Sequence, residues 1–521
     1  MSGERPLLES SDERAAVTRN AVSSYASRGL LLLGAILLTP YLYRTLGPAG
    51  FGTWSVIFAL ATVFSLLEVG ISAGLVRFVA ALRAAGERDA LVAMARAGVV
   101  LMTGVGVLAA GFAALAAVTL DGLAAPAHRQ EFRAGLLALG AAVLIRFACV
   151  ASGAVLNGHQ RYDLTSLSLS LTTVGSVIGS IAAVEAGFGV QGVALAHAVA
   201  LVGGGLLYVV LLARLDRELV LGRRQRGSAG PLRGLLGFSS YTFLADSMVF
   251  VGQRMDVIVI AAVRDAVAAA PYAAAIKLQS GIQALTLPLI EMLMPMLSAL
   301  WAAGRRDEVA RRLTLATRGT LQVTLPLAAG IALFAPDVVD LWLGSEAPSV
   351  TATIVVLLMA VQALTLAPFP AEKALIAVGR ARAIGGLALI EGLANVALSI
   401  MLTFRYGALG PALGTLFTNG LFAPIRFPLI CRALGWPLSR FLRESIGVAF
   451  VSSLPALALL GLLWFVLPSG ALRAIGGPGA GALLALAVAA HQVRSRRRRA
   501  TQSGSGDAGL ESPLASRVSP P

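Results

Sequence analysis

Charged residues are scarce in this sequence. Asp, Glu, Lys and Arg make up only 13% of its 521 residues, whereas apolar residues make up 57% and the mean hydropathy is +0.80. A soluble chain of this length could not hide so much apolar surface from water. The composition therefore excludes a soluble globular protein and predicts one whose solvent is the lipid bilayer.

Cysteine and histidine are also sparse. Cys149 and Cys431 fall in or beside apolar segments, so they offer no disulfide framework or metal-ligand spacing, and we interpret them as packing residues. The four histidines have neither catalytic nor metal-ligand spacing. They are His128, His159, His197 and His491. A nucleotide-binding G-x-x-x-x-G-K-S/T loop is missing too. We therefore expect that ATP does not drive the activity of this chain directly, and we expect no cofactor.

Long apolar segments recur along the chain and predict an all-α polytopic membrane protein with about fourteen transmembrane helices. The segments are centred near residues 33, 62, 108, 146, 174, 202, 247, 284, 328, 363, 393, 420, 455 and 481. The first 19 residues lack the apolar core and cleavage site of a signal peptide, so the first helix should remain in the mature protein.

Basic residues are distributed unevenly between the loops. With a cytoplasmic N-terminus, the inner loops and both tails carry 31 of the 42 Lys and Arg, the outer loops six and the helices five. Because cytoplasmic loops are enriched in Lys and Arg, both termini are predicted to be cytoplasmic. This topology accounts for the net charge of +15 without a nucleic-acid partner. The basic run at 494–499 is expected to touch anionic membrane lipids.

The sequence also resembles itself at an offset of about 216 to 221 residues. The matching positions are Ser23-Ser24-Tyr25 and Ser239-Ser240-Tyr241, 84–89 and 302–307, Gly158 and Arg161 with Gly379 and Arg382, and Gly187 and Gly192 with Gly407 and Gly410. A repeat of six helices enters the membrane from the same side both times. It therefore predicts two six-helix lobes in parallel, related by a pseudo-two-fold axis, plus two C-terminal helices.

The predicted boundaries follow from the helices and the repeat. They are a cytoplasmic tail (1–19), an N-lobe (20–213), a cytoplasmic linker (214–233), a C-lobe (234–432), two further helices (433–493) and a basic, disordered cytoplasmic tail (494–521).

Three stretches carry a family resemblance: Leu46–Trp54, Leu156–Asp163 and Pro295–Ser298. With the helix plan, they resemble the polysaccharide-transport family, whose members flip O-antigen and related repeat units. That family belongs to the superfamily of multidrug and toxin extruders and lipid II flippases. The resemblance implies two lobes around a central cavity that opens alternately to each side. In such flippases the cavity is typically cationic, matching the diphosphate and acidic sugars of the cargo.

Charged residues within the predicted helices are the candidate site residues, because each costs about 2.5 to 3.5 kcal/mol at a helix centre on insertion scales. Arg146 is predicted near the midplane, where its guanidinium either binds phosphate or pairs with a carboxylate of a neighbouring helix. Arg28 and Lys277 are further substrate-binding candidates, with snorkelling to the interface as the alternative.

The seventh helix carries the other candidates. Asp246 is predicted at mid-depth, as an ion-coupling site or as the partner of Arg146 or Arg28. Arg254 and Asp256 are candidates for substrate binding and ion coupling, with capping or an interface position as the alternative, since two residues so close in sequence point to different helix faces. Four embedded residues are interpreted as structural: Glu68, Glu291, Glu391 and Arg426. The embedded cations, Arg426 included, outnumber the two aspartates, which favours an anionic substrate.

These features predict a flippase that moves a polyprenyl-diphosphate-linked oligosaccharide from the cytoplasmic to the outer leaflet of a bacterial inner membrane by alternating access. A polysaccharide polymerase or chain-length machinery is its expected protein partner. The alternatives are a lipid II-type flippase and an ion-coupled multidrug or toxin extruder, which would need an acidic cavity for cationic drugs. A membrane enzyme is disfavoured, because the outer loops are short and the first lacks paired acids.

Overall fold

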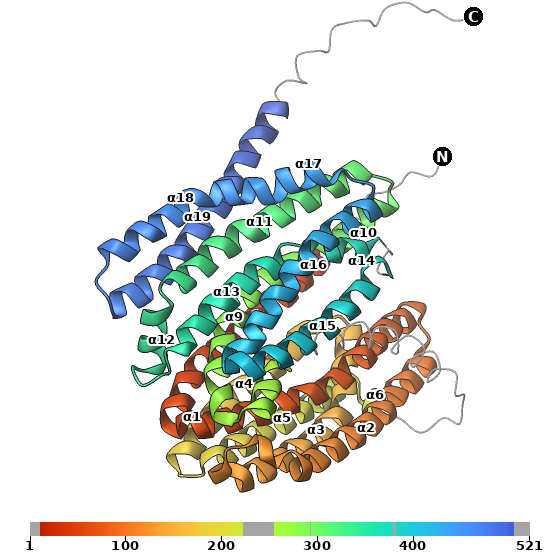
Figure 1. Ribbon diagram of the computed structural model, residues 1–521. Coiled ribbons are helices and arrows are strands. Elements are labelled where there is room, and N and C mark those ends of the chain that lie inside the picture. The colour runs from red at the N-terminus through yellow and green to blue at the C-terminus, as the bar shows by residue number, and fades with distance from the viewer. Residues whose placement is uncertain (1–10, 222–254, 292, 379–381, 505–521) are drawn as a thin grey trace, which may run out of the picture.

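The computed structural model describes residues 11–221, 255–291, 293–378 and 382–504. Within these ranges the chain forms α-helices joined by turns and short 3₁₀ or π segments, and no strand occurs (Figure 1). The prediction of an all-α protein is therefore confirmed.

The helices fall into three groups along the chain. The first half comprises α1 (Ser11–Ala85), α2 (Arg88–Thr119), η1 (Asp121–Leu123), η2 (Pro126–His128), α3 (Arg129–Gly158), α4 (Tyr162–Glu185), α5 (Gly189–Leu215) and α6 (Arg217–Leu221). The second half comprises α8 (Asp256–Val263), α9 (Ala266–Glu291), α10 (Leu293–Ala302), α11 (Arg306–Leu333), α12 (Ala335–Leu343), α13 (Val350–Leu366), α14 (Phe369–Ala377), α15 (Arg382–Tyr406), η3 (Gly407–Leu409) and α16 (Gly410–Leu434). The C-terminal group comprises α17 (Leu438–Leu442), η4 (Arg443–Gly447), α18 (Val448–Val466) and α19 (Ala471–Gly504).

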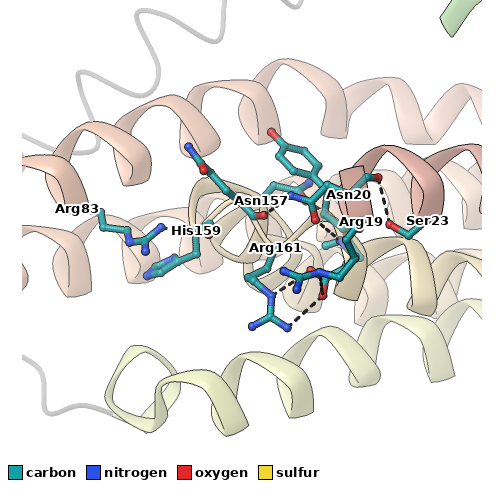
Figure 2. Close-up of polar contacts among 11 residues, drawn as sticks. Arg19, Asn20, Ser23, Arg83, Asn157, His159 and Arg161 are labelled. Carbon is teal, nitrogen blue, oxygen red and sulfur yellow. Dashed lines mark hydrogen bonds and ion pairs between the residues drawn. The ribbon is translucent and has the colours of Figure 1, made fainter. Parts of the chain in front are cut away.

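The long helix α1 turns back on itself at Gly47, which has φ 67° and ψ 173°. A straight helix of 75 residues would be about 110 Å long. Instead, residues near its two ends reach the same loop: the Asn20 amide donates to the Gln160 carbonyl at 2.8 Å, and Arg83 donates to the His159 carbonyl at 3.1 Å (Figure 2). α1 therefore supplies two antiparallel helices. We call the end of the bundle at this loop the proximal end and the opposite end, at Gly47, the distal end.

The loop at the proximal end is one of the three stretches that carry the family resemblance. Gln160 has φ 58°, and no other non-glycine residue has a positive φ in the part of the chain that the structure describes. Asp163 lies 3.0 Å from Arg161 and 3.4 Å from Arg19 (Figure 2). Its amide donates to the side-chain oxygen of Asn20 at 3.2 Å. This stretch therefore fastens α1 to the turn between α3 and α4.

The outer surfaces of the helices are apolar, as a bilayer requires. Phe112 is 59% exposed and Phe465 is 78% exposed. Among the described residues, eight helical segments are long and apolar enough to cross a membrane, or nine with the pair α11–α12, which is bent by 71°. The chain is thus a multi-pass membrane protein. The exact number of fourteen stays a prediction, since the span centred near residue 247 lies outside the described residues.

The predicted repeat has matching turns in the two halves. Gly86 and Gly304, 218 residues apart, have φ of 73° and 72°. In each turn the glycine amide donates to the carbonyl three residues earlier (3.1 and 3.0 Å), and the next amide donates to the carbonyl five residues earlier (3.0 Å in both). Gly187 and Gly407 likewise both have positive φ, of 81° and 59°. The matches at 239–241 and at Gly379 lie outside the described residues.

The two halves join along α1 and α9. The start of α9 is rich in alanine, and Ala269, Ala270 and Ala274 are fully buried against α1 and its neighbours. Gly52 of α1 comes so close to the Ala266 carbonyl oxygen that an added Cβ would lie 1.9 Å from it. Small residues therefore permit the close contact between the halves near the distal end.

Two glycines of α16 should respond oppositely to substitution by alanine. An added Cβ at Gly410 would lie 2.3 Å from the backbone nitrogen of Thr403, whereas nothing lies within 4 Å of one at Gly420. We expect Gly410→Ala to lower the free energy of unfolding by about 1 to 3 kcal/mol. Gly420→Ala should leave it unchanged or raise it by up to about 1 kcal/mol. Thermal unfolding of the detergent-solubilised protein measures both, and equal stability of the variants would contradict this packing.

Candidate functional site

A histidine occupies the interior of the first half. The Nδ1 atom of His197, on α5, lies 2.7 Å from the hydroxyl of Ser176, on α4. The edge of the imidazole packs against two rings of α1, with centroid distances of 5.8 Å to Trp54 and 5.4 Å to Phe58. The ring is therefore held in one orientation inside the helix bundle.

Arg146 lies near the middle of α3 and is half-buried. Its guanidinium lies 5.7 Å from the centroid of the Tyr208 ring on α5, a cation–π distance. Gly205 lets α5 approach closely, since an added Cβ there would lie 3.3 Å from the Arg146 Cα. Arg146 also lies within electrostatic range of Glu68 on α1 and of His197. Among the described residues, Glu68 is thus a carboxylate near Arg146, and the choice between phosphate binding and pairing with a carboxylate stays a prediction.

Lys277 reaches the same region from the second half. Its Nζ lies 4.9 Å from the centroid of the Phe58 ring, and its charge also acts on His197. Arg146, His197 and Lys277, which we call the central basic cluster, therefore come from α3, α5 and α9. Two predicted substrate-binding residues, 131 positions apart in sequence, share a histidine neighbour across the junction of the halves.

Of the other two predicted substrate-binding residues, Arg28 and Arg254, the structure describes Arg28. Arg28 is exposed on α1, eight residues after Asn20, or about 12 Å from the proximal end. Arg254 and the predicted ion-coupling residue Asp246 lie outside the described residues. Their assignment, like that of Arg28, stays a prediction.

Asp256, the second predicted ion-coupling residue, lies in the interior of the second half. It is 5% exposed and accepts a hydrogen bond from the hydroxyl of Tyr272, which is 1% exposed. The Ser399 hydroxyl lies close to the same carboxylate. Three helices, α8, α9 and α15, thus surround this acid, which is also the first residue of α8. Its assignment to ion coupling stays a prediction.

Arg426 is not available as a cation for substrate. It is buried on α16, and its Nε donates to Glu391 of α15 at 3.0 Å. A second carboxylate, of Glu372 on α14, lies 3.5 Å away. The structural interpretation of Arg426 and Glu391 agrees with these contacts. Arg426 therefore does not add to the predicted surplus of embedded cations, and that prediction is corrected for this residue, because the carboxylates of Glu391 and Glu372 balance its charge.

Several interior polar residues were missed from the sequence. The sequence does not indicate a role for His197, because the four histidines have neither catalytic nor metal-ligand spacing. Its aromatic and basic neighbours come from three other helices, so only packing brings them together. In the second half, Gln283 donates to Gln362 at 3.2 Å and Asn395 donates to Thr415 at 2.9 Å. Polar residues in apolar segments were the available signal, but the sequence gives no register between helices.

Charges at the proximal end are paired. Arg88, at the start of α2, donates to both carboxylate oxygens of Asp216, one at 2.7 Å, and to Glu218 at 3.2 Å. The hydrogen bonds from Arg88 hold the pKa of Asp216 below its usual value. Asp216 is therefore ionised at neutral pH, and the pair links α2 to the segment between α5 and α6.

Comparison with known proteins connects this architecture to a family. A family model described as polysaccharide biosynthesis protein matches residues 17–301, more than half of the chain. The comparison with curated proteins returns no match.

Solved structures with the same fold are membrane transporters. A structure of the lipid II flippase MurJ in an inward closed conformation matches 91% of this chain and 99% of its own, with TM-score 0.67 and 15% identity. An inward-facing multidrug resistance MATE family transporter of the MOP superfamily matches 81% and 98%, with TM-score 0.67 and 16% identity. An outward-facing MATE transporter matches 81% and 95%, also at 16% identity, but with TM-score 0.53. The chain thus has the MurJ and MATE transporter fold and is more similar to the inward-facing MATE structure than to the outward-facing one.

Substitution of Arg426 should destabilise the fold, and a second substitution, at Glu391, should restore part of the lost stability. Arg426→Met leaves the half-buried carboxylates of Glu391 and Glu372 without their cation, and removing one partner of a buried ion pair costs about 3 to 5 kcal/mol. Arg426→Met with Glu391→Met removes one of those carboxylates. We expect the single variant to have the lower unfolding temperature of the two in detergent. A single variant as stable as the native chain would contradict the structural role.

Proposed function

Because the chain belongs to the polysaccharide biosynthesis protein family, we propose that it is a flippase for a polyprenyl-diphosphate-linked oligosaccharide. It carries this cargo from the cytoplasmic to the outer leaflet of a bacterial inner membrane. The observation that carries the proposal is the central basic cluster, to which both halves contribute.

The chemistry of the cluster suits a diphosphate. Arg146 offers a planar fork of donors for two phosphate oxygens, and Lys277 offers a compact charge. Both cations lie over aromatic rings, Arg146 over Tyr208 and Lys277 over Phe58, and these contacts stabilise positive charge at the junction of the halves. A charge held this way inside a membrane protein is costly, which favours a role in function.

The cluster also suits alternating access. Arg146 and His197 belong to the first half, whereas Lys277 belongs to the second. If the halves are the lobes of the predicted 20–213 and 234–432 division, rocking one against the other changes the distance between Lys277 and the other two. The cargo head group then sits where the lobes separate, while its lipid tail stays in the bilayer.

The orientation of the protein is part of the proposal. The excess of Lys and Arg in the loops at the proximal end supports a cytoplasmic proximal end, with both termini inside the cell. The 433–493 helices follow the C-lobe, and the basic run at 494–499 then meets the anionic inner leaflet. A polysaccharide polymerase or chain-length machinery would receive the cargo outside.

A lipid II-type flippase is the second candidate, since the fold is similar to that of MurJ and lipid II also carries a diphosphate. The central basic cluster serves either cargo. It gives less support to an extruder of cationic drugs, which would need acidic residues in its place. The family and the fold are those of transporters, which favours a flippase or exporter over the membrane enzyme.

Neutralising the cluster should slow transport. We expect Arg146→Gln and Lys277→Gln each to reduce flipping of a polyprenyl-diphosphate oligosaccharide by about tenfold or more, because a hydrogen bond to a charged group contributes roughly 1.5 to 3 kcal/mol. The measurement is a proteoliposome flipping assay at matched protein content.

Arg264→Gln is the matched control for these variants. Arg264 donates to the carbonyls of Thr403 and Phe404 at the distal end, at 3.3 and 2.6 Å, away from the cluster. The Arg264→Gln variant should therefore flip the oligosaccharide at the native rate. The proposal fails if Arg146→Gln also retains that rate, or if Arg264→Gln loses as much.

Asp256 is proposed to couple transport to a cation gradient. Its burial and its bond from Tyr272 support a carboxylate that changes its protonation or cation occupancy during the cycle. Asp256→Asn keeps the shape and an acceptor for Tyr272 but removes the charge. We expect its flipping rate to be insensitive to imposed proton or sodium gradients, while Asp216→Asn responds as the native chain does. A gradient response that persists in Asp256→Asn would exclude this coupling site.

A further inference from the structure

The two halves are hydrogen-bonded to each other at the distal end through Trp342. Its indole N–H, from α12 of the second half, donates to the backbone carbonyl of Ile36 on α1 at 2.9 Å. That carbonyl would normally accept the amide of residue 40, but residue 40 is Pro40, which has no N–H. A helix carbonyl freed by proline in one half is thus satisfied by a side chain of the other.

Arg44 makes the reciprocal contact eight residues, or about two turns, further along α1 than Ile36. Its guanidinium donates to three successive carbonyls of the second half, those of Leu341 at 2.9 Å, Trp342 at 3.1 Å and Leu343 at 3.2 Å. These are the last carbonyls of α12, which lack partners within the helix and carry the negative end of its dipole. α12 ends at Gly344, with φ 102°. A cation of α1 therefore caps a helix of the opposite half.

On α1, Arg44 lies three residues and Ile36 eleven residues before Gly47, so both contacts lie toward the distal end, where Gly52 also approaches the Ala266 carbonyl. In Figure 1, α12 lies at the distal end beside α1, away from both termini. Separating the halves at this end would leave the Ile36 carbonyl without a donor in an apolar region, and would uncover the carbonyl end of α12. An unsatisfied polar group is costly in a bilayer. The contacts thus stabilise one conformation selectively.

We propose that Trp342 and Arg44 form a distal latch, which holds the distal end closed and must release for the cargo to leave on that side. This inference rests on the proposed alternating access, because a latch has a function only if the distal end opens. The greater similarity of the chain to the inward-facing MATE structure than to the outward-facing one agrees with a closed distal end. Pro40 belongs to the latch, since it supplies the carbonyl that Trp342 binds.

The test measures the opening of the distal end directly. Spin labels at Gly122→Cys and Glu346→Cys, both exposed at this end in different halves, report the distance between the halves by electron–electron double resonance in lipid nanodiscs. Cys149 and Cys431 are buried, and a sample without the introduced cysteines measures their background. We expect Trp342→Phe and Arg44→Gln each to raise the ratio of open to closed distances by about threefold to tenfold.

Pro40→Ala gives a third, independent measurement with little risk to folding. Alanine restores the amide that bonds the Ile36 carbonyl within α1, so the helix gains a hydrogen bond while Trp342 becomes redundant. The open fraction should therefore rise although Trp342 and Arg44 are both present. An open fraction that stays at the native value in this variant and in Trp342→Phe would overturn the latch.

Two matched controls separate the latch from general effects of the substitutions. Arg264 also donates to carbonyls near a helix end, those of Thr403 at 3.3 Å and Phe404 at 2.6 Å, but donor and acceptors both belong to the second half. Arg264→Gln and Trp464→Phe should leave the distances unchanged, and a shift equal to that of the latch variants would refute the proposal. The measurement needs no cargo, so a failed oligosaccharide assay and a failed latch are distinguishable outcomes.

Discussion

A polar group inside a bilayer must find its partner within the protein, and this constraint organises the whole chain. It explains why the described residues are helical almost throughout, since helices satisfy their own backbone. It also explains the exceptions. Where Pro40 frees the Ile36 carbonyl, a tryptophan of the other half supplies the donor. Where Arg426 is buried, two carboxylates surround it. Departures from a plain apolar helix are met by specific partners from elsewhere in the fold.

The interior charges differ in how firmly they are held. Arg426 is paired with carboxylates, and such a pair resists exchange because both charges would lose their partner. Arg146 and Lys277 lie over aromatic rings instead, which stabilise a positive charge through the ring face. The arrangement at Arg426 belongs to structure. The arrangement at Arg146 and Lys277 belongs to the proposed binding of an anionic cargo.

Hydropathy alone predicted an all-α multi-pass protein, because the length of a span and the absence of charge are properties of local sequence. The predicted repeat agrees with the turns at Gly86 and Gly304, since each turn needs a residue in the left-handed region and each has glycine there. The contacts between side chains of different helices could not be predicted from the sequence. Arg426 meets Glu391 at a separation of 35 residues and Lys277 meets Phe58 at 219, and each contact depends on how helices rotate about their axes.

The contacts between the halves differ in chemistry along the length of the helices. Midway through the helices, the halves meet through residues suited to a charged ligand. At the distal end, they meet through a proline-freed carbonyl and a capped helix end, neither of which is suited to a ligand. In the proposed cycle, a cargo that bridges Arg146 and Lys277 would draw the halves together at the middle of the helices, away from the distal contacts. Both sets of contacts include residues of α1, which are Phe58 at the centre and Ile36 and Arg44 at the distal end. Under this proposal, a change in the bend of α1 at Gly47 would act on both sets and would couple binding at the centre to closure at the distal end.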